Sequence, residues 1–66
     1  MERIATERAR IGKTQGALAG ELGVARQTVW RWETGRAKPP ATAVVVMAAL
    51  FGCSSDYLIG ATDERS

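Results

Sequence analysis

Four neighbouring side chains combine two guanidinium groups, an amide and an indole: Arg26, Gln27, Trp30 and Arg31. At about 100° per residue they fan over one arc of a helix, and no acidic residue stands among them. In the major groove of DNA, guanidinium groups fork onto guanine edges, a Gln amide pairs with an adenine edge, and apolar groups touch thymine methyls. The pattern therefore predicts a helix that presents a base-reading surface to duplex DNA.

The opposite arc of this helix is apolar, because Ala25, Val29 and Trp32 share it as the expected core stripe. Gly35 follows and is expected to end the helix in the left-handed conformation. The plainer interpretation is an amphipathic surface helix whose polar side merely faces water. A solvated face normally mixes both charge signs, and an outward Trp is an unusual use of so large an apolar area. We therefore favour the nucleic-acid interpretation.

The composition argues against several classes of function. The chain has 66 residues, one cysteine and no histidine, which removes an internal disulfide, the usual zinc frameworks and most hydrolytic triads. Paired carboxylates on one face and a glycine-rich phosphate loop are also missing, so we expect no enzymatic activity, catalytic residue, metal site, cofactor or small-molecule substrate. No apolar stretch has the length of a membrane span. The first residues are charged and lack the apolar region of a signal peptide, so we expect none. We expect a cytoplasmic protein without a membrane partner.

Charge is distributed unevenly along the chain, although the net charge is only +2. Between Arg8 and Lys38 seven basic residues stand against two acids, and from Pro39 onward three acids outnumber a single Arg. The molecule should therefore have one basic end and one acidic end. A polyanion would be attracted to the basic end.

Apolar periodicity and turn residues predict an all-α fold, a compact bundle of five short helices with a central helix-turn-helix. The first helix is expected from about residue 1 to 11. Thr14 is expected to cap the second helix, which runs to Leu22. The third helix should span Ala25 to about Thr34, after a corner of helix-turn-helix length.

A fourth helix is expected from position 40 or 41 to Phe51, after two prolines that forbid helix continuation. A short last helix should follow, capped by Ser54 or Ser55, and residues 57–59 should return apolar groups to the core. We expect a helix-turn-helix DNA-binding domain over residues 1–60 and a flexible C-terminal tail over residues 61–66.

With these landmarks in order, the chain resembles the Cro/C1-type (XRE) helix-turn-helix family, the lambda-repressor-like DNA-binding domains of phage repressors and bacterial regulators. The resemblance runs from about Arg8 to Gly60. Its matches are Thr14-Gln15, Leu18-Ala19, Leu22-Gly23-Val24, Thr28-Val29, Arg31-Trp32-Glu33, Gly35, Lys38-Pro39, Ala48, Gly52, Ser54 and the segment from Asp56 to Gly60. No single match is specific, whereas all of them at the right spacings make a strong signal.

The resemblance implies that the third helix is a recognition helix lying in the major groove. Arg26, Gln27 and Arg31 stand where family members contact base edges. Contacts to the sugar-phosphate backbone are implied for four further residues: Gln15, Thr28, Arg36 and Lys38. Gln15 is also expected to brace the recognition helix. Arg8 and Glu33 match a pair that ties the first helix to the end of the third.

Two positions of the recognition helix depart from the family pattern. Ala25 stands where Ser or Thr usually caps the helix, at a cost of about 1 kcal/mol. Trp30 occupies a position that is normally small or polar. It either packs against a neighbouring chain or serves DNA binding, by touching thymine methyls or by stacking Arg26 over its indole.

The leading hypothesis is a sequence-specific, double-stranded-DNA-binding transcriptional regulator, a repressor that binds an inverted-repeat operator as a homodimer. The apolar fourth helix and the segment from Tyr57 to Ile59 are the candidates for the dimer contact. The alternative is an antitoxin or adaptor that uses the same fold chiefly to bind a partner protein.

Overall fold

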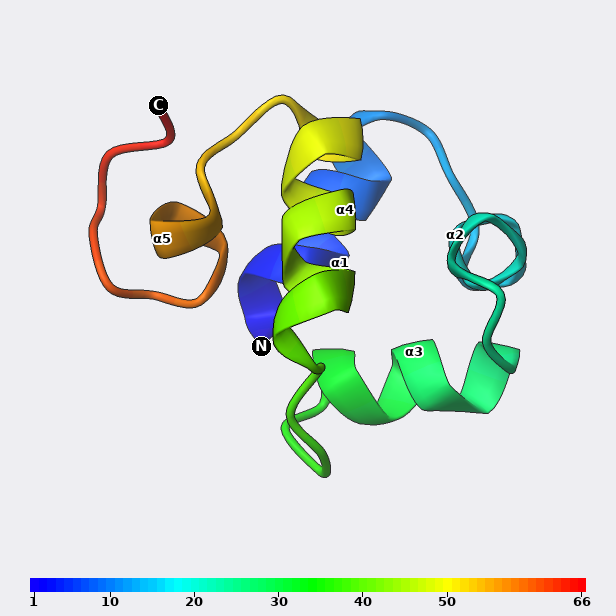
Figure 1. Cartoon of the computed structure of the whole chain (residues 1–66). Helices are drawn as coiled ribbons and strands as arrows, with labels where there is room; N and C mark the ends of the chain where they lie inside the picture. The colour runs from blue at the N-terminus through cyan, green and yellow to red at the C-terminus, as the bar shows by residue number, and fades with distance from the viewer.

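A computed structural model describes all 66 residues, and its regular structure consists of helices alone. The helices are α1 (Glu2–Arg10), α2 (Gln15–Leu22), α3 (Arg26–Glu33), α4 (Ala41–Phe51) and α5 (Ser55–Leu58). In Figure 1, α4 runs through the centre with α1 behind it, α2 is seen end-on, and α3 lies across the lower edge. The predicted all-α bundle of five short helices is confirmed.

Side-chain hydroxyl groups cap the N-termini of two helices. The Thr14 hydroxyl accepts a hydrogen bond from the Ala17 N–H at 3.0 Å, as predicted. At the start of α5 the Ser54 hydroxyl accepts from the Tyr57 N–H at 3.0 Å, so Ser54 and not Ser55 is the cap. Each cap satisfies one of the N–H groups that a helix leaves unpaired at its start.

Two glycines set the corners on either side of α3. Gly23 ends α2 with φ +70° and Gly35 follows α3 with φ +79°, a left-handed conformation that favours glycine because it has no Cβ. Only Val24 and Ala25 separate Gly23 from the first residue of α3. The chain therefore makes the tight corner of a helix-turn-helix.

One apolar core joins all five helices. Its buried members are Ile4, Leu18, Ala19, Val29, Trp32, Val44, Met47, Ala48, Phe51 and Leu58. The predicted core position of Trp32 is confirmed, whereas Ala25 and Ile59 are exposed. Ala25 lies outside the core because it precedes the first turn of α3 as its N-cap residue. Ile59 lies beyond the last residue of α5, so only Leu58 of the segment 57–59 is fully buried.

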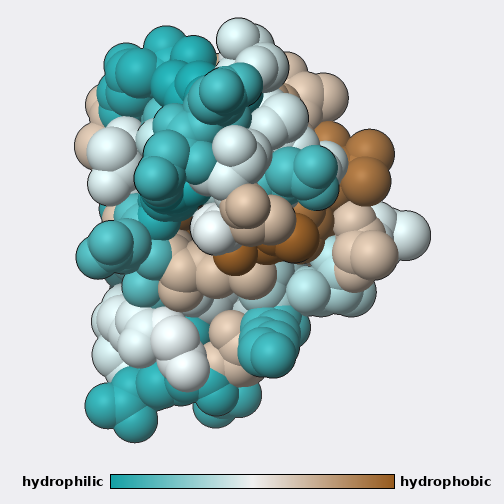
Figure 2. All heavy atoms as spheres, turned by 90° about the vertical axis from the view of Figure 1, so that its left-hand side faces the viewer, coloured by the Kyte–Doolittle hydropathy of each residue, from teal (hydrophilic) through white to brown (hydrophobic).

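The most apolar helix, α4, buries only part of its surface. Val45 is 60% exposed and Val46 44% exposed, and Ile59 adds a further exposed apolar side chain after α5. Figure 2 looks onto the side of the molecule that carries α5 and the C-terminal segment, and it shows a hydrophobic patch within a largely hydrophilic surface. Part of α4 is therefore free to contact another molecule.

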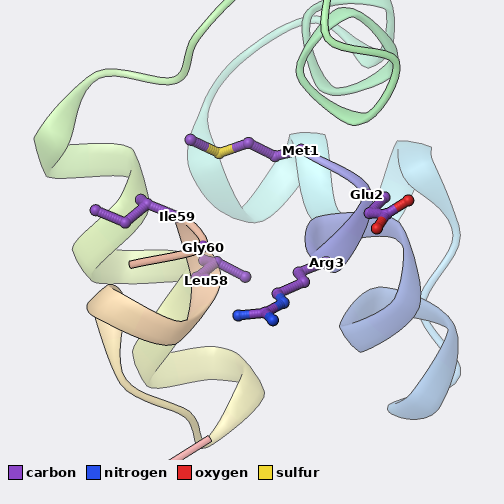
Figure 3. Close-up of a pocket in the computed structure, with 6 residues that line it drawn as sticks. All are labelled: Met1, Glu2, Arg3, Leu58, Ile59 and Gly60. Atoms are coloured by element: carbon purple, nitrogen blue, oxygen red, sulfur yellow. The ribbon is translucent and has the colours of Figure 1, made fainter. Parts of the chain in front are cut away.

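Arg3 connects α1 to the C-terminal part of the chain. Its guanidinium group donates to the carbonyls of Tyr57 at 2.8 Å and Thr62 at 2.5 Å, and it lies 4.2 Å from the centre of the Tyr57 ring. In Figure 3 the Arg3 side chain reaches from α1 toward the end of α5, whereas Glu2 points away from it. This contact holds the first and last helices together.

A second connection centres on Glu7, a carboxylate that is only 2% exposed. It accepts hydrogen bonds from Arg65 at 2.9 Å and from Arg10 at 3.0 Å. The hydrogen bonds from Arg65 lower the pKa of Glu7 most, while burial acts in the opposite direction. No pattern in the sequence indicates Glu7 as a buried group. A flexible segment is expected over residues 61–66; in the structure Arg65 of this segment is bound to α1, and the flexibility stays a prediction.

Candidate nucleic-acid interface

The outer side of α3 carries the predicted base-reading group. Arg26, Gln27, Trp30 and Arg31 are all exposed, whereas Val29 and Trp32 on the inner side are buried. In Figure 1, α3 lies at the lower edge of the molecule and the loop that follows it projects beyond the rest of the chain. The four side chains therefore stand at an exposed edge of the molecule.

Ion pairing divides the nine Lys and Arg residues into two groups. Those outside α3 and its following loop all form ion pairs with acids: Arg3, Arg8, Arg10, Lys13 and Arg65. The remaining cations form none and are all exposed: Arg26, Arg31, Arg36 and Lys38. The positive charge that is free to meet an anionic partner therefore lies on α3 and the loop after it.

Glu33, the last residue of α3, holds that helix against the two preceding ones. Its side chain is 6% exposed and accepts from Arg8 Nε at 2.6 Å and from Gln15 Nε2 at 2.9 Å. The predicted pair of Arg8 and Glu33 is confirmed, and Glu33 raises the pKa of Arg8. Arg8 also donates to the Lys13 carbonyl at 2.9 Å, which fixes the connection between α1 and α2.

Gln15 braces the recognition helix through this bond to Glu33, as the sequence predicts. No spacing in the sequence indicates Glu33 as the acceptor of this bond. Gln15 also borders an open hollow of about 320 Å³ on the outer surface, together with Arg26, Gln27 and Trp30 of α3. The structure thus brings one predicted phosphate contact beside three predicted base contacts, and the phosphate contact itself stays a prediction.

The loop after α3 is folded back onto the end of that helix. The N–H groups of Arg36 and Ala37 donate to the Arg31 carbonyl at 2.9 and 3.3 Å. This places the Arg36 guanidinium 5.1 Å from the centre of the Trp30 ring. In the structure Arg36 stacks on this indole, and not Arg26 as expected.

Thr28 and Lys38 complete the predicted set. Thr28 is half-buried near the start of α3, where its N–H donates to the Ala25 carbonyl at 3.0 Å. Lys38 is exposed in the loop next to Pro39, which is buried. Burial of Pro39 anchors the loop close to Lys38. The contacts of both residues with a DNA backbone stay predictions.

None of the five helices combines the length and the apolar character that a membrane-spanning helix requires. His, Cys, Asp and Glu side chains form no group of three or more that could hold a metal ion. The single cysteine, Cys53, is half-buried, and its burial raises the pKa of the thiol.

Two helices joined by a tight glycine corner, with unpaired cations on the second of them, define the helix-turn-helix class of DNA-binding domains. The family model described as a helix-turn-helix domain matches residues 2–58. The chain belongs to this family, and its resemblance to the Cro/C1-type (XRE) members is confirmed.

Two bacterial proteins illustrate the relationship. The chain is 35% identical over 51 residues to the uncharacterized HTH-type transcriptional regulator YobD of Bacillus subtilis (strain 168), an alignment that covers 77% of this chain and 46% of that protein. It is 37% identical over 66 residues to the cryptic phage CTXphi transcriptional repressor RstR of Vibrio cholerae serotype O1, covering 97% of this chain and 59% of that protein. The chain thus spans about half the length of the curated relatives it matches. The family and these relatives together support DNA-binding transcription regulation.

Proposed function

We propose that the chain is a sequence-specific, double-stranded-DNA-binding transcriptional regulator whose α3 enters the major groove. The observation that carries this proposal is the arrangement of charge. Every cation outside α3 and its loop is paired with an acid, whereas Arg26, Arg31, Arg36 and Lys38 are unpaired and exposed. A duplex carries one negative charge per about 1.7 Å of its axis, so this edge is the part of the molecule that it attracts.

The residues of this edge would contact different parts of the DNA according to their position on the helix or on the loop. Arg26, Gln27 and Arg31 project from the outer side of α3 and would read base edges in the groove. Arg36 and Lys38 stand on the loop, and Gln15 and Thr28 at the starts of α2 and α3, where they would contact the flanking phosphates. Phosphate contacts position a protein on DNA, whereas base contacts distinguish one sequence from another.

The division is tested on a site selected from a random DNA pool, with a random duplex as the second ligand. Arg31→Ala and Gln27→Ala should each weaken the selected site by about 1–3 kcal/mol and leave random DNA nearly unchanged. Lys38→Ala should weaken both duplexes and reduce the slope of log affinity against log salt by about 1.

Lys13→Ala is the matched control for this experiment, because Lys13 is a cation already paired with Glu21 at 2.8 Å. It should reduce affinity much less than Lys38→Ala does and leave the salt slope nearly unchanged, because it alters only the long-range field by leaving the exposed Glu21 unpaired. Equal losses on both duplexes from Arg31→Ala and Gln27→Ala would refute the base-reading role. A loss from Lys13→Ala as large as that from Lys38→Ala would refute the argument from unpaired charge.

The proposed regulator acts as a homodimer on an inverted repeat, and the relative named a transcriptional repressor favours repression as its mode of action. The exposed apolar side chains of Val45 and Ile59 support this arrangement. Val45 and Ile59 border an open hollow of about 520 Å³ at the start of α4, and Lys38 and Pro39 of the loop after α3 line it as well. A two-fold axis along this hollow would keep both recognition helices on one edge of the dimer, facing paired half-sites.

Substitutions at two valines of α4 test the proposed dimer contact, because Val45 and Val46 border different hollows. Val45→Glu should convert the dimer to a monomer in sedimentation experiments and weaken the inverted repeat far more than a single half-site. Val46→Glu is the control, since Val46 borders a separate hollow beside Trp32 and Pro40. A wild-type monomer that protects a single half-site, or equal effects of both substitutions, would refute this interface.

A further inference from the structure

Trp30 is an exposed aromatic residue in the middle of the recognition helix. Trp30 is 38% exposed, whereas Trp32, two positions later, is 4% exposed and belongs to the core. The fold therefore uses one indole for stability and leaves the other at the surface. Exposed apolar area of this size on a face that otherwise carries polar groups indicates a contact with a partner.

The Trp30 ring has a defined place on this face. The Arg36 guanidinium lies over the ring, with its central carbon 5.1 Å from the ring centre. The backbone N–H of Arg36 donates a hydrogen bond to the Arg31 carbonyl at 2.9 Å. A guanidinium group that stacks by its face keeps the N–H donors on its edge available for other acceptors. Arg36 can thus restrain the indole and still contact a phosphate.

The same indole is the one apolar member of the hollow of about 320 Å³ that Gln15, Arg26 and Gln27 also line. Trp30 lies three residues after Gln27 and four after Arg26, so all three occupy neighbouring positions on one helix face. Side chains of a helix lean toward its N-terminus, which brings the indole toward these polar groups. A ligand that fills the hollow must therefore offer an apolar group beside hydrogen-bonding edges.

Among the four bases, thymine alone offers such a group in the major groove, the methyl at C5. We propose that Trp30 is a specificity-determining residue that selects thymine, by contact of its indole with the C5-methyl of a thymine next to the base pair that Gln27 reads. Arg36 acts as a positioning residue that holds the ring. This inference rests on the proposed function, and it assigns one base of the recognised site to one side chain.

Replacement of thymine by deoxyuridine tests the contact, because it removes the methyl group and leaves the pairing edge unchanged. A site is first selected from a random DNA pool with the wild-type chain. Each thymine of that site is then replaced singly, and dissociation constants are measured for the wild type, Trp30→Ala and Trp30→Phe. At one thymine the wild type should lose about fourfold in affinity, the loss expected for one buried methyl group.

The corresponding loss should vanish in Trp30→Ala and persist in part in Trp30→Phe, which keeps an aromatic face. Gln27→Ala is the control from the same hollow: it should keep the sensitivity to that methyl group while losing discrimination at a neighbouring base pair. Circular dichroism checks that each variant is folded. Arg36→Ala should reduce the methyl sensitivity without abolishing it, whereas the phosphate control Lys38→Ala should not change it.

A selected site without any methyl-sensitive thymine would overturn the inference, and so would a methyl sensitivity that survives in Trp30→Ala. Either result would leave the proposed function standing, because the wild type would still bind its site. A wild-type chain that selects no DNA sequence and binds random duplexes no better than it binds heparin would instead overturn the proposed function, and this inference with it.

Discussion

Substitution of Glu33 tests how the recognition helix is held in place. Its carboxylate is 6% exposed, receives a two-pronged contact from Arg8 and accepts a third hydrogen bond from Gln15. Glu33→Leu replaces the carboxylate by an apolar side chain of similar volume. It leaves the Arg8 guanidinium, which is 18% exposed, without its ionic partner. Breaking a buried ion pair by removing one partner costs about 3–5 kcal/mol, and the partial exposure of Arg8 places this case at the lower end, about 3 kcal/mol.

That loss is large for a chain of this size. Domains are stable by about 0.05–0.15 kcal/mol per residue, which for 66 residues is roughly 3–10 kcal/mol. A loss of about 3 kcal/mol corresponds to a fall in melting temperature of about 12–24 °C in a domain of 60–100 residues. Glu21→Ala is the matched control, because the pair of Glu21 and Lys13 is 41% and 30% exposed; an exposed pair contributes about 0–1 kcal/mol.

Thermal and urea unfolding of Glu33→Leu, Arg8→Met and the double variant separate the pair from its surroundings. Each single variant should lose several times as much stability as Glu21→Ala, and the double variant should lose much less than the sum. Replacing both partners by apolar groups leaves no buried charge unpaired. Additive losses, or a Glu33→Leu variant that melts within a few degrees of Glu21→Ala, would refute the role assigned to Glu33.

Two further predictions concern the core and the buried carboxylate. Trp32→Ala should cost about 3–5 kcal/mol in urea titrations and leave the domain largely unfolded, whereas Trp30→Ala, at a residue that is 38% exposed, should cost far less; a well-folded Trp32→Ala variant would contradict the core assignment. The lowered pKa of Glu7 means that its contribution to stability is present above its ordinary value of 4.5 and is lost as the pH falls through its folded-state value. The stability advantage of the wild type over Glu7→Gln should therefore shrink as the pH falls below about 4.5, as measured by unfolding at each pH, and an advantage that is constant with pH would exclude Glu7 as its source.

Local rules were sufficient to predict the helices of this fold. The cap at Thr14 and the left-handed Gly35 after α3 depend on residues within one or two turns of each other. Such interactions are readable from sequence because their partners are fixed by spacing. The exposed position of Ile59 was missed because the extent of a four-residue helix depends on what packs beyond its end.

In the candidate site, too, some features follow from the local sequence and others depend on the tertiary fold. Which residues of α3 face outward follows from helical period alone. The contacts of Glu33 with Gln15 and of Arg36 with Trp30 depend on how the loop and α2 fold back onto α3, so no spacing along the chain indicates them. The bond between Glu7 and Arg65 spans 58 positions, and no local pattern links residues that far apart.

Charge pairing explains how a chain with a net charge of only +2 can present a strongly basic edge. The acids that are paired, Glu7, Glu21, Glu33 and Asp63, neutralise cations of α1, the loop before α2 and the C-terminal segment. None of them pairs with a cation of the outer side of α3 or of the loop after it. Glu33 achieves this although it belongs to α3, because its carboxylate is turned inward onto Arg8 and Gln15. The acid that secures α3 is thus buried away from the outer side of this helix, and the charges of Arg26, Arg31, Arg36 and Lys38 reach solvent without an ion pair to cancel them.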